Sequence, residues 1–187
     1  MKRREMLWAT LASLAVSGCA QANNPPNPAD NGFQVKQGEG RPGKQYHMKA
    51  VTHNRMDVKI SGDDTRGALA VFEQQGQSQG IGPPLHIHPN QDEWMHILEG
   101  QYLFQVGQGE YRAGPGDTIY MPRGVQHAFV QLSDRSRMLV SYAPAGRMEA
   151  FFKATSEAQG KLSPDQIARL FTDHDMEVVG GMLSRQG

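Results

Sequence analysis

The stretch that decides the fold of this chain is GIGPPLHIHPNQDE, residues 80–93. It carries His86, His88 and the carboxylate of Glu93. The two histidines are two positions apart, so on an extended segment both side chains leave from the same face. A second stretch, GDTIYMPRGVQH at residues 116–127, ends in His127. Three imidazoles and one carboxylate form a complete ligand set for a first-row transition metal.

The composition of the chain favours a single domain built from short strands. Its 187 residues, 38% of them hydrophobic, suit one globular domain with extensions. The formal net charge is zero, and removal of residues 1–18 takes away three basic residues and one acidic residue, which leaves −2. This balance gives no reason to expect a nucleic-acid partner. With 21 Gly and 11 Pro, turns should be frequent, which argues against a helix bundle.

The N-terminus has the form of a bacterial export signal. A basic triplet at 2–4 precedes an apolar stretch at 6–16 that is too short to cross a bilayer. The sequence VSGC at 16–19 resembles a lipoprotein lipobox, and the paired arginines loosely resemble a twin-arginine signal. Cleavage after Ala22 is the alternative and would release a soluble periplasmic protein. We expect a periplasmic protein anchored to a bacterial membrane through lipidated Cys19.

The single cysteine and the segment after it define the domain plan. Cys19 is the only cysteine, so an exported domain could form no internal disulfide and would be stabilised by its core and a metal. Residues 19–45 are rich in Asn, Pro, Gly and Gln and predict a flexible linker. We therefore expect a signal peptide at 1–18 and one folded domain at 46–183.

Alternating polar and apolar residues dominate that domain and predict strands. The predicted strands are 56–60, 68–73, 93–98, 102–106, 118–121, 128–132 and 137–143. Glycine-containing turns separate them, which favours an antiparallel sandwich or small barrel. Two helices should follow, one at 147–155 and one that begins with Ser163 as N-cap and Pro164 at its first position and runs to Phe171. We expect both to pack outside the barrel, over an edge or an opening.

The two histidine-containing stretches resemble the two motifs of the cupin superfamily, which together span 80–131. The pattern Gly-x5-His-x-His-x4-Glu-x6-Gly is met by Gly80, His86, His88, Glu93 and Gly100. The pattern Gly-x5-Pro-x-Gly-x2-His-x3-Asn is met by Gly116, Pro122, Gly124 and His127, with Gln131 in place of Asn. The resemblance implies an all-β double-stranded β-helix, or jelly roll, with the metal inside the barrel. This agrees with the predicted strands.

The surrounding sequence resembles the small bacterial single-domain cupins of the quercetin 2,3-dioxygenase-like group. The similar segments are 84–94, 122–129, 142–146 and 176–180. The resemblance implies a dioxygenase that acts on a flavonol-like, catechol-like or other small enolic substrate. Its divalent Fe, Mn, Ni, Co or Cu would be held by His86, His88, Glu93 and His127, with Glu93 also the general base. Zn would leave the site redox-inert. The resemblance also implies a homodimer.

Two functions from other classes remain open. The first is a periplasmic binding module that holds a small anionic ligand on the metal without turnover. The second is a non-oxidative isomerase or decarboxylase in which the metal is a Lewis acid. Oxygen consumption would separate the dioxygenase from both, and substrate depletion without oxygen would separate the second from the first.

Other residues in the domain have simpler interpretations. His96 should lie on the outer face of its strand because it is three positions after Glu93. His47, His53 and His174 lie outside both motifs and are predicted on the surface. Six apolar residues could line a pocket beside the site or simply pack in the core: Met95, Ile97, Phe104, Met121, Phe129 and Met138.

Overall fold

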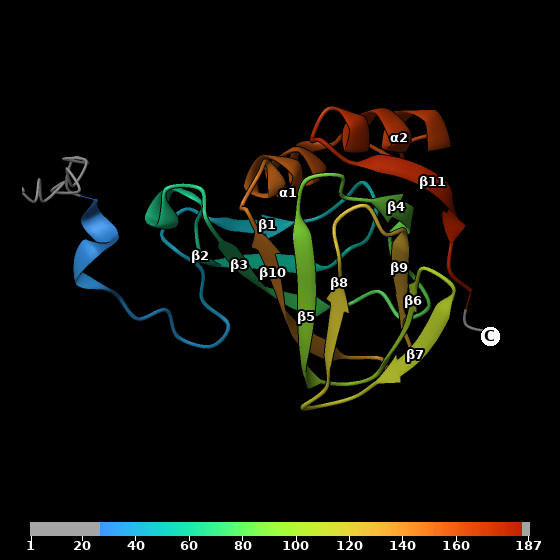
Figure 1. The fold of residues 1–187 in the computed structure, drawn as a ribbon, viewed down its shortest axis with the longest axis horizontal. Helices are drawn as coiled ribbons and strands as arrows, with labels where there is room; N and C mark the ends of the chain where they lie inside the picture. The colour runs from blue at the N-terminus through green and yellow to red at the C-terminus, as the bar shows by residue number, and fades with distance from the viewer. Residues whose placement is uncertain (1–26, 185–187) are drawn as a thin grey trace, which may run out of the picture.

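The fold is a barrel of two antiparallel β-sheets, seen in a computed structural model that describes residues 27–184 (Figure 1). One sheet has six strands in the order β1 (Gln45–His47), β2 (Arg55–Ile60), β3 (Ala70–Gly76), β10 (Ser136–Ala143), β5 (Asp92–Glu99) and β8 (Thr118–Met121). The other has five in the order β11 (Glu177–Met182), β4 (Pro84–Ile87), β9 (His127–Gln131), β6 (Tyr102–Val106) and β7 (Gly109–Ala113). The expected jelly-roll barrel is confirmed. The expected signal peptide and Cys19 lie outside the described residues.

The seven predicted strands are all present, with ends that differ by a few residues. Their alternation shows in β5, where Glu93, Met95 and Ile97 are buried and the side chains between them are partly exposed. Successive side chains on a pleated strand face opposite sides, so the buried set points into the barrel. The same set carries Glu93, which places a carboxylate among apolar core residues.

Strands β1, β4, β7 and β11 were not among the predicted strands. The central residues of β7 are exposed, and β7 is the outermost strand of its sheet, so no apolar alternation marks it. Strand β11 contains Gly180 and Gly181 and is also an outermost strand. Edge strands bury few side chains and therefore leave a weak sequence signal.

The core fills the space between the two sheets. Phe72, Tyr102 and Phe104 are fully buried and come from β3 and β6, which belong to opposite sheets. The Tyr102 hydroxyl donates to Ser136 Oγ at 2.6 Å, which satisfies its polar group inside the core. Burial of each large apolar side chain contributes roughly 1.5–3 kcal/mol.

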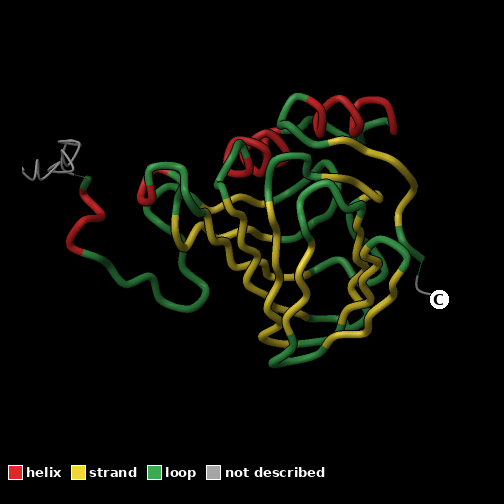
Figure 2. Tube along the Cα trace, in the orientation of Figure 1, coloured by secondary structure: helices red, strands yellow, loops and turns green. Residues whose placement is uncertain are grey.

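The two predicted helices are present, and both lie over one end of the barrel (Figures 1 and 2). Helix α1 (Met148–Glu157) buries residues at positions i, i+3, i+4 and i+7, namely Met148, Phe151, Phe152 and Thr155. Helix α2 (Pro164–Thr172) begins with a capping box, in which Ser163 Oγ accepts from the Gln166 backbone N–H and Gln166 Oε1 accepts from the Ser163 N–H. No helix in residues 27–184 is long and apolar enough to span a bilayer.

The segment before β1 begins with a short 3-10 helix, η1 (Pro28–Asn31), and loops out to one side of the barrel before it returns to β1 (Figure 2). A second 3-10 helix, η2 (Asp63–Thr65), lies between β2 and β3. The segment is held by an Arg41–Asp64 ion pair at 2.7 Å and by Lys59, whose Nζ donates to two of its backbone carbonyls. These contacts attach residues 36–41 to η2 and to β2.

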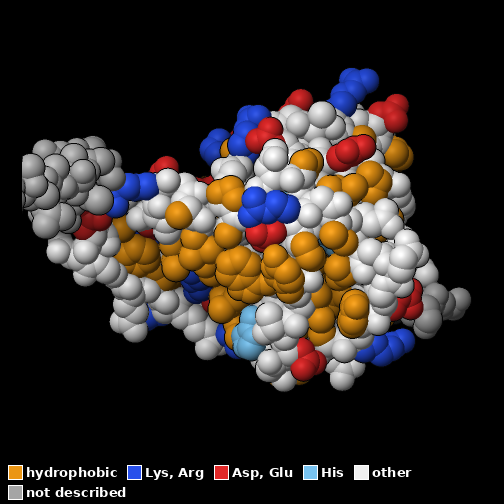
Figure 3. All heavy atoms as spheres, in the orientation of Figure 1, with side chains coloured by type: hydrophobic (Ala, Val, Ile, Leu, Met, Phe, Trp, Pro, Cys, Tyr) orange, Lys and Arg blue, Asp and Glu red, His pale blue; other side chains and the backbone are white. Residues whose placement is uncertain are grey.

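The outer face of the six-stranded sheet carries apolar side chains. Strand pairing aligns Val71, Ser141, Trp94 and Tyr120 in one row across β3, β10, β5 and β8. Tyr120 is 56% exposed, and Figure 3 shows apolar side chains gathered over this face. Apolar patches of this kind mark candidate contact surfaces.

Candidate metal centre

The structure brings together the four residues that the sequence predicted as ligands. His86 lies on β4, and His127 lies opposite it on β9. Glu93 comes from β5 in the other sheet, and His88 follows β4 directly. One ligand atom from each of the four lies within 4.8 Å of the others, and all four side chains are buried. The site therefore bridges the two sheets inside the barrel.

A close approach of two backbones helps to set β4 beside β9. Gly82 lies just before β4, and a Cβ at this position would stand 1.6 Å from the Phe129 carbonyl oxygen. Such a contact excludes any side chain, so the segment needs glycine here. The close packing of these segments places His86 across from His127.

Each histidine ring is oriented by a hydrogen bond on its outer nitrogen. His86 Nδ1 lies 2.8 Å from the Pro84 carbonyl oxygen, and His127 Nδ1 lies 2.9 Å from the Val125 carbonyl oxygen. His88 Nδ1 lies 2.9 Å from Gln91 Oε1. Because these oxygens only accept, each Nδ1 carries a proton and donates. The Nε2 atoms are thereby left to face the centre, which is the arrangement of metal-binding imidazoles.

The histidine nitrogens that face the centre of the site lack part of their hydrogen bonding within the described residues. His88 Nε2 is buried and has no hydrogen-bond partner among residues 27–184, and it lies 3.5 Å from Glu93 Oε2. His127 Nε2 lies 2.9 Å from the same oxygen. With its proton on Nδ1, a neutral His127 would present a lone pair to an anionic oxygen, which is unfavourable unless the two atoms share a cation. A second proton on the ring would make this contact a hydrogen bond, and a divalent metal fits the whole donor set.

The charges of the site follow from burial and from Glu93. Burial lowers the pKa of His88 and lowers that of His86 well below its usual value, so both rings are neutral. For His127 burial also acts to lower the pKa, but the hydrogen bond and charge of Glu93 outweigh it and raise the pKa. Burial acts to raise the pKa of Glu93, yet the hydrogen bond from His127 and the three rings lower it to about 2. Glu93 is therefore an anion.

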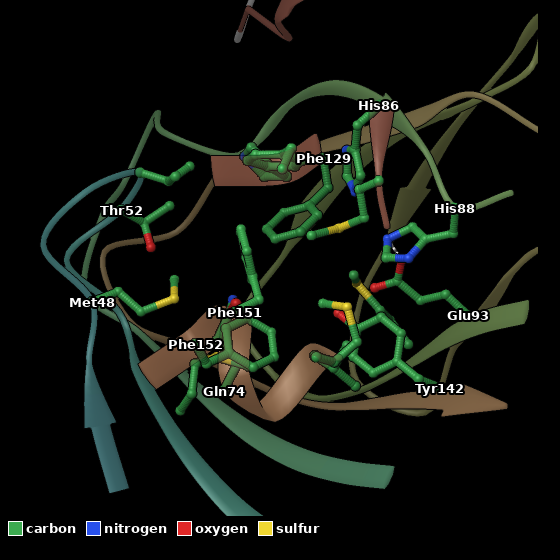
Figure 4. Close-up of a pocket in the computed structure, with 18 residues that line it drawn as sticks. Met48, Thr52, Gln74, His86, His88, Glu93, Phe129, Tyr142, Phe151 and Phe152 are labelled. Atoms are coloured by element: carbon green, nitrogen blue, oxygen red, sulfur yellow. Dashed lines mark ion pairs between the residues drawn. The ribbon is translucent and has the colours of Figure 1, made fainter. Parts of the chain in front are cut away.

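An apolar cavity of about 50 Å³ adjoins the site. Figure 4 shows His86, His88 and Glu93 at one end of it and Met48 and Thr52 at the other. Helices α1 and α2 contribute Phe151, Phe152 and Phe171 to its walls, so the helices cover an opening of the barrel. Of the six predicted wall residues, only Met95 and Phe129 line the cavity. Ile97, Phe104, Met121 and Met138 pack in the core.

The sequence motifs did not identify several residues of the site. Gln91 orients His88 and is itself held by donation from its Nε2 to the Pro144 carbonyl oxygen at 2.8 Å. Tyr142 faces Glu93 from β10, and burial, together with the charge and hydrogen bond of Glu93, raises its pKa well above the usual value. Gln74 lines the cavity, and its Nε2 has no hydrogen-bond partner among residues 27–184. Gln74 in β3 and Tyr142 in β10 occupy positions whose side chains point into the barrel, and the spacing of inward-pointing residues could have identified them.

The remaining histidines are mostly where the sequence placed them. His47 and His53 are exposed, and His96 lies on the outer face with Nδ1 2.9 Å from Thr118 Oγ1. The prediction for His174 is wrong, because this residue is only 9% exposed. The turn after α2 folds its ring onto Phe151, with centroids 5.7 Å apart, and its Nδ1 contacts the Leu170 carbonyl oxygen at 2.7 Å.

About half of the chain is similar to known proteins. An uncharacterised protein of Streptomyces coelicolor is 28% identical over 104 residues, which cover 52% of this chain and 97% of the relative. KdgF from a Halomonas species is 18% identical with a TM-score of 0.44, covering 49% of this chain and 78% of that one. A sugar phosphate isomerase of the cupin superfamily from Silicibacter pomeroyi is 27% identical with a TM-score of 0.41, covering 48% and 59%.

The family model that matches is described as a cupin domain, and it covers residues 73–142. This range contains both histidine motifs and all four residues of the candidate centre. The same residues run through strands of both antiparallel sheets. On this match, and on the jelly-roll barrel built around it, residues 73–142 form a cupin domain.

Proposed function

We propose that this cupin is a metal-dependent dioxygenase that acts on a small enolic substrate. The observation that carries the proposal is a buried anionic carboxylate among three histidines, at the end of an apolar cavity. The substrate and dioxygen together give a product that carries both oxygen atoms, so the reaction needs no external reductant.

The dimensions of the cavity favour a small substrate over a flavonol. A cavity of roughly 150 Å³ is needed to hold benzene, and drug-sized ligands take roughly 300 Å³ or more. The cavity beside Glu93 is about 50 Å³. A flavonol would require displacement of the helices that cover the barrel, whereas a compact enol of a few carbons requires a smaller adjustment of the side chains around it.

The donor set determines what the site could hold. His86, His88, His127 and Glu93 fit a divalent Fe, Mn, Ni, Co or Cu ion, which would polarise substrate oxygens and supply redox chemistry with dioxygen. The three rings are held in place by their Nδ1 hydrogen bonds. This preorganisation keeps the Nε2 lone pairs aimed at one point.

Glu93 is the group that we propose takes the substrate proton. Its pKa of about 2 makes it a weak base, so it accepts a proton readily only from an acidic hydroxyl. This property favours enols and catechols over aliphatic alcohols. Tyr142 lies against Glu93 and is a hydrogen-bond donor that can hold the carboxylate in place. Apolar walls, including Met95 and Phe129, lower the polarity around these groups and strengthen their polar contacts.

The test is oxygen consumption by the metal-loaded mature protein with a panel of enols, catechols and flavonols. We expect uptake with small enols, and Glu93→Gln should retain part of the metal and lose turnover sharply. Glu110→Gln, a substitution of an exposed glutamate, is the matched control. Substrate loss without oxygen uptake would favour an isomerase or decarboxylase, and binding without turnover would favour a binding module. Unchanged turnover in Glu93→Gln would refute the base role.

We also propose export and anchoring through a lipidated Cys19, on the sequence signal alone. Fractionation of the producing bacterium should place the wild type with membranes. Cys19→Ala should move the protein to the soluble periplasmic fraction. Recovery of the wild type in the soluble fraction would instead support cleavage after Ala22.

A further inference from the structure

A second hollow lies beside the metal cavity, on the outside of the covered end of the barrel. It is a groove of about 740 Å³, a volume typical of small-molecule sites. Its walls are the loop 49–53 between β1 and β2, the connection 158–162 between α1 and α2, and three single residues, Ile81, Ile167 and Met182. Five different parts of the chain thus converge on it.

The groove and the metal cavity share a wall. Val51 and Thr52 line both spaces. Thr52 is 3% exposed, and its Oγ1 accepts a hydrogen bond from the Asn54 backbone N–H at 3.4 Å. Figure 4 shows Thr52 at the end of the cavity away from His88. A ligand in the groove is therefore separated from the metal cavity by one short loop.

That loop is attached at its ends and lies outside the sheets. Met48 N–H donates to the Asn54 carbonyl oxygen at 2.9 Å, which closes the loop, and Lys49 N–H donates to the Thr155 carbonyl oxygen at 3.1 Å. No strand pairing involves residues 49–53. Passage through this wall consequently requires movement of the loop but no separation of β-strands.

The rim of the groove is positively charged. Lys49 and Lys161 are exposed, and neither makes an ion pair within residues 27–184. The lining also includes His53 but no aspartate or glutamate. Two uncompensated ammonium groups beside one hollow create a local positive potential that attracts anions.

The remainder of the groove lining is largely apolar. Ile81 is 38% exposed and Met182 is 50% exposed, and Val51, Leu162 and Ile167 are partly buried beside them. A ligand that gains from this surface must carry an apolar body as well as a negative charge. Each methylene buried there would contribute up to about 0.8 kcal/mol.

We propose that this groove is the docking site and entrance through which the metal cavity receives its ligand, and that the ligand is a small amphipathic carboxylate. Its carboxylate contacts Lys49 and Lys161, and its apolar body lies over Ile81 and Met182 beside the Val51–Thr52 wall. The assignment rests on the proposed function only in identifying this ligand as the substrate. It restricts the enols of the proposed reaction to those that carry a carboxylate.

The experiment measures binding of hexanoate and of uncharged hexanamide to the full-length mature protein by calorimetry. We expect hexanoate to bind at least about ten-fold more tightly than hexanamide, and added salt to weaken it. Lys49→Gln and Lys161→Gln should each cost about three-fold in hexanoate affinity and together about ten-fold. Lys36→Gln is the matched control, since this lysine is exposed and lies outside the groove.

The outcomes separate the docking site from the proposed reaction. Equal affinities for hexanoate and hexanamide, no binding of either, or an equal loss in Lys36→Gln would overturn the docking site. The double variant Lys49→Gln/Lys161→Gln could lose hexanoate affinity while no enol supports oxygen uptake. That result would support the docking site and refute the dioxygenase. Thermal unfolding of each variant shows whether its fold is intact. For a turned-over carboxylate substrate, the lysine substitutions should raise KM and leave kcat unchanged.

Discussion

Replacement of Glu93 by Gln removes a buried negative charge and keeps a side chain of nearly the same shape. In the wild type Glu93 Oε2 lies 2.9 Å from His127 Nε2 and 3.5 Å from His88 Nε2, and the carboxylate is 1% exposed. The Gln amide can still hydrogen-bond to His127 Nε2, since its oxygen accepts from a protonated ring and its nitrogen donates to a neutral one. The change in stability of the chelator-treated protein therefore reports mainly the charge.

The pKa of Glu93 sets the size of that change. It falls from 4.5 to about 2 on folding, and a tenfold change in proton affinity corresponds to about 1.4 kcal/mol. The ionised carboxylate thus contributes roughly 3 kcal/mol, an order-of-magnitude figure. Because the folded pKa is the lower one, this stability is present above pH 4.5 and is lost as pH falls through about 2.

Urea unfolding of the metal-free wild type and Glu93→Gln at about pH 7 and about pH 3 measures this contribution. The variant should be less stable by roughly 3 kcal/mol at the higher pH and by less than half of that at the lower pH. Glu110→Gln, at an exposed site, should differ from the wild type by less than about 0.5 kcal/mol at the higher pH. If Glu93→Gln lost no more stability than the control, or lost the same amount at both pH values, the ionised Glu93 carboxylate would not stabilise the fold as proposed.

Three further predictions follow from other contacts. Metal uptake at about pH 6.5 should release a proton from His127, because the pKa of this ring lies above its usual value. Calorimetry in buffers of different ionisation enthalpy should detect the released proton. A heat of binding that does not depend on the buffer would contradict the prediction. Ser163→Ala should cost about 1 kcal/mol in urea unfolding by removing the N-cap of α2, whereas an unchanged midpoint would show that the capping box contributes little. The homodimer stays a prediction: sedimentation should find a dimer that Tyr120→Lys weakens, and a monomeric wild type would refute it.

Much of the fold was predictable because its strongest elements repeat a simple pattern. Strand β5 buries every second side chain between Glu93 and Ile97, so a period of two marks it. Helix α2 was predictable for a different reason: Ser163 and Pro164 form a local start signal. The outer strands β7 and β11 bury little, and no sequence period identifies them.

The four residues at the centre could be predicted because each belongs to a short motif with fixed spacing along the sequence. The residues that shape the cavity could not, since their roles depend on contacts between distant segments. Phe151 and Phe171 belong to helices whose position over the barrel no motif specifies. His174 was misassigned for the same reason, because the turn after α2 carries it onto Phe151. Gln91 lies within the first motif, but its role emerges only from its contacts with His88 and the Pro144 carbonyl.

The central claim, that His86, His88, Glu93 and His127 hold a metal, is tested most directly by elemental analysis of the purified mature protein. We expect about one transition-metal ion per chain in the wild type and almost none in His88→Ala. His96→Ala, which removes a histidine from the outer face of the barrel, should keep the wild-type content. A wild type without metal after growth with each candidate ion, or equal metal content in His88→Ala and His96→Ala, would contradict the claim.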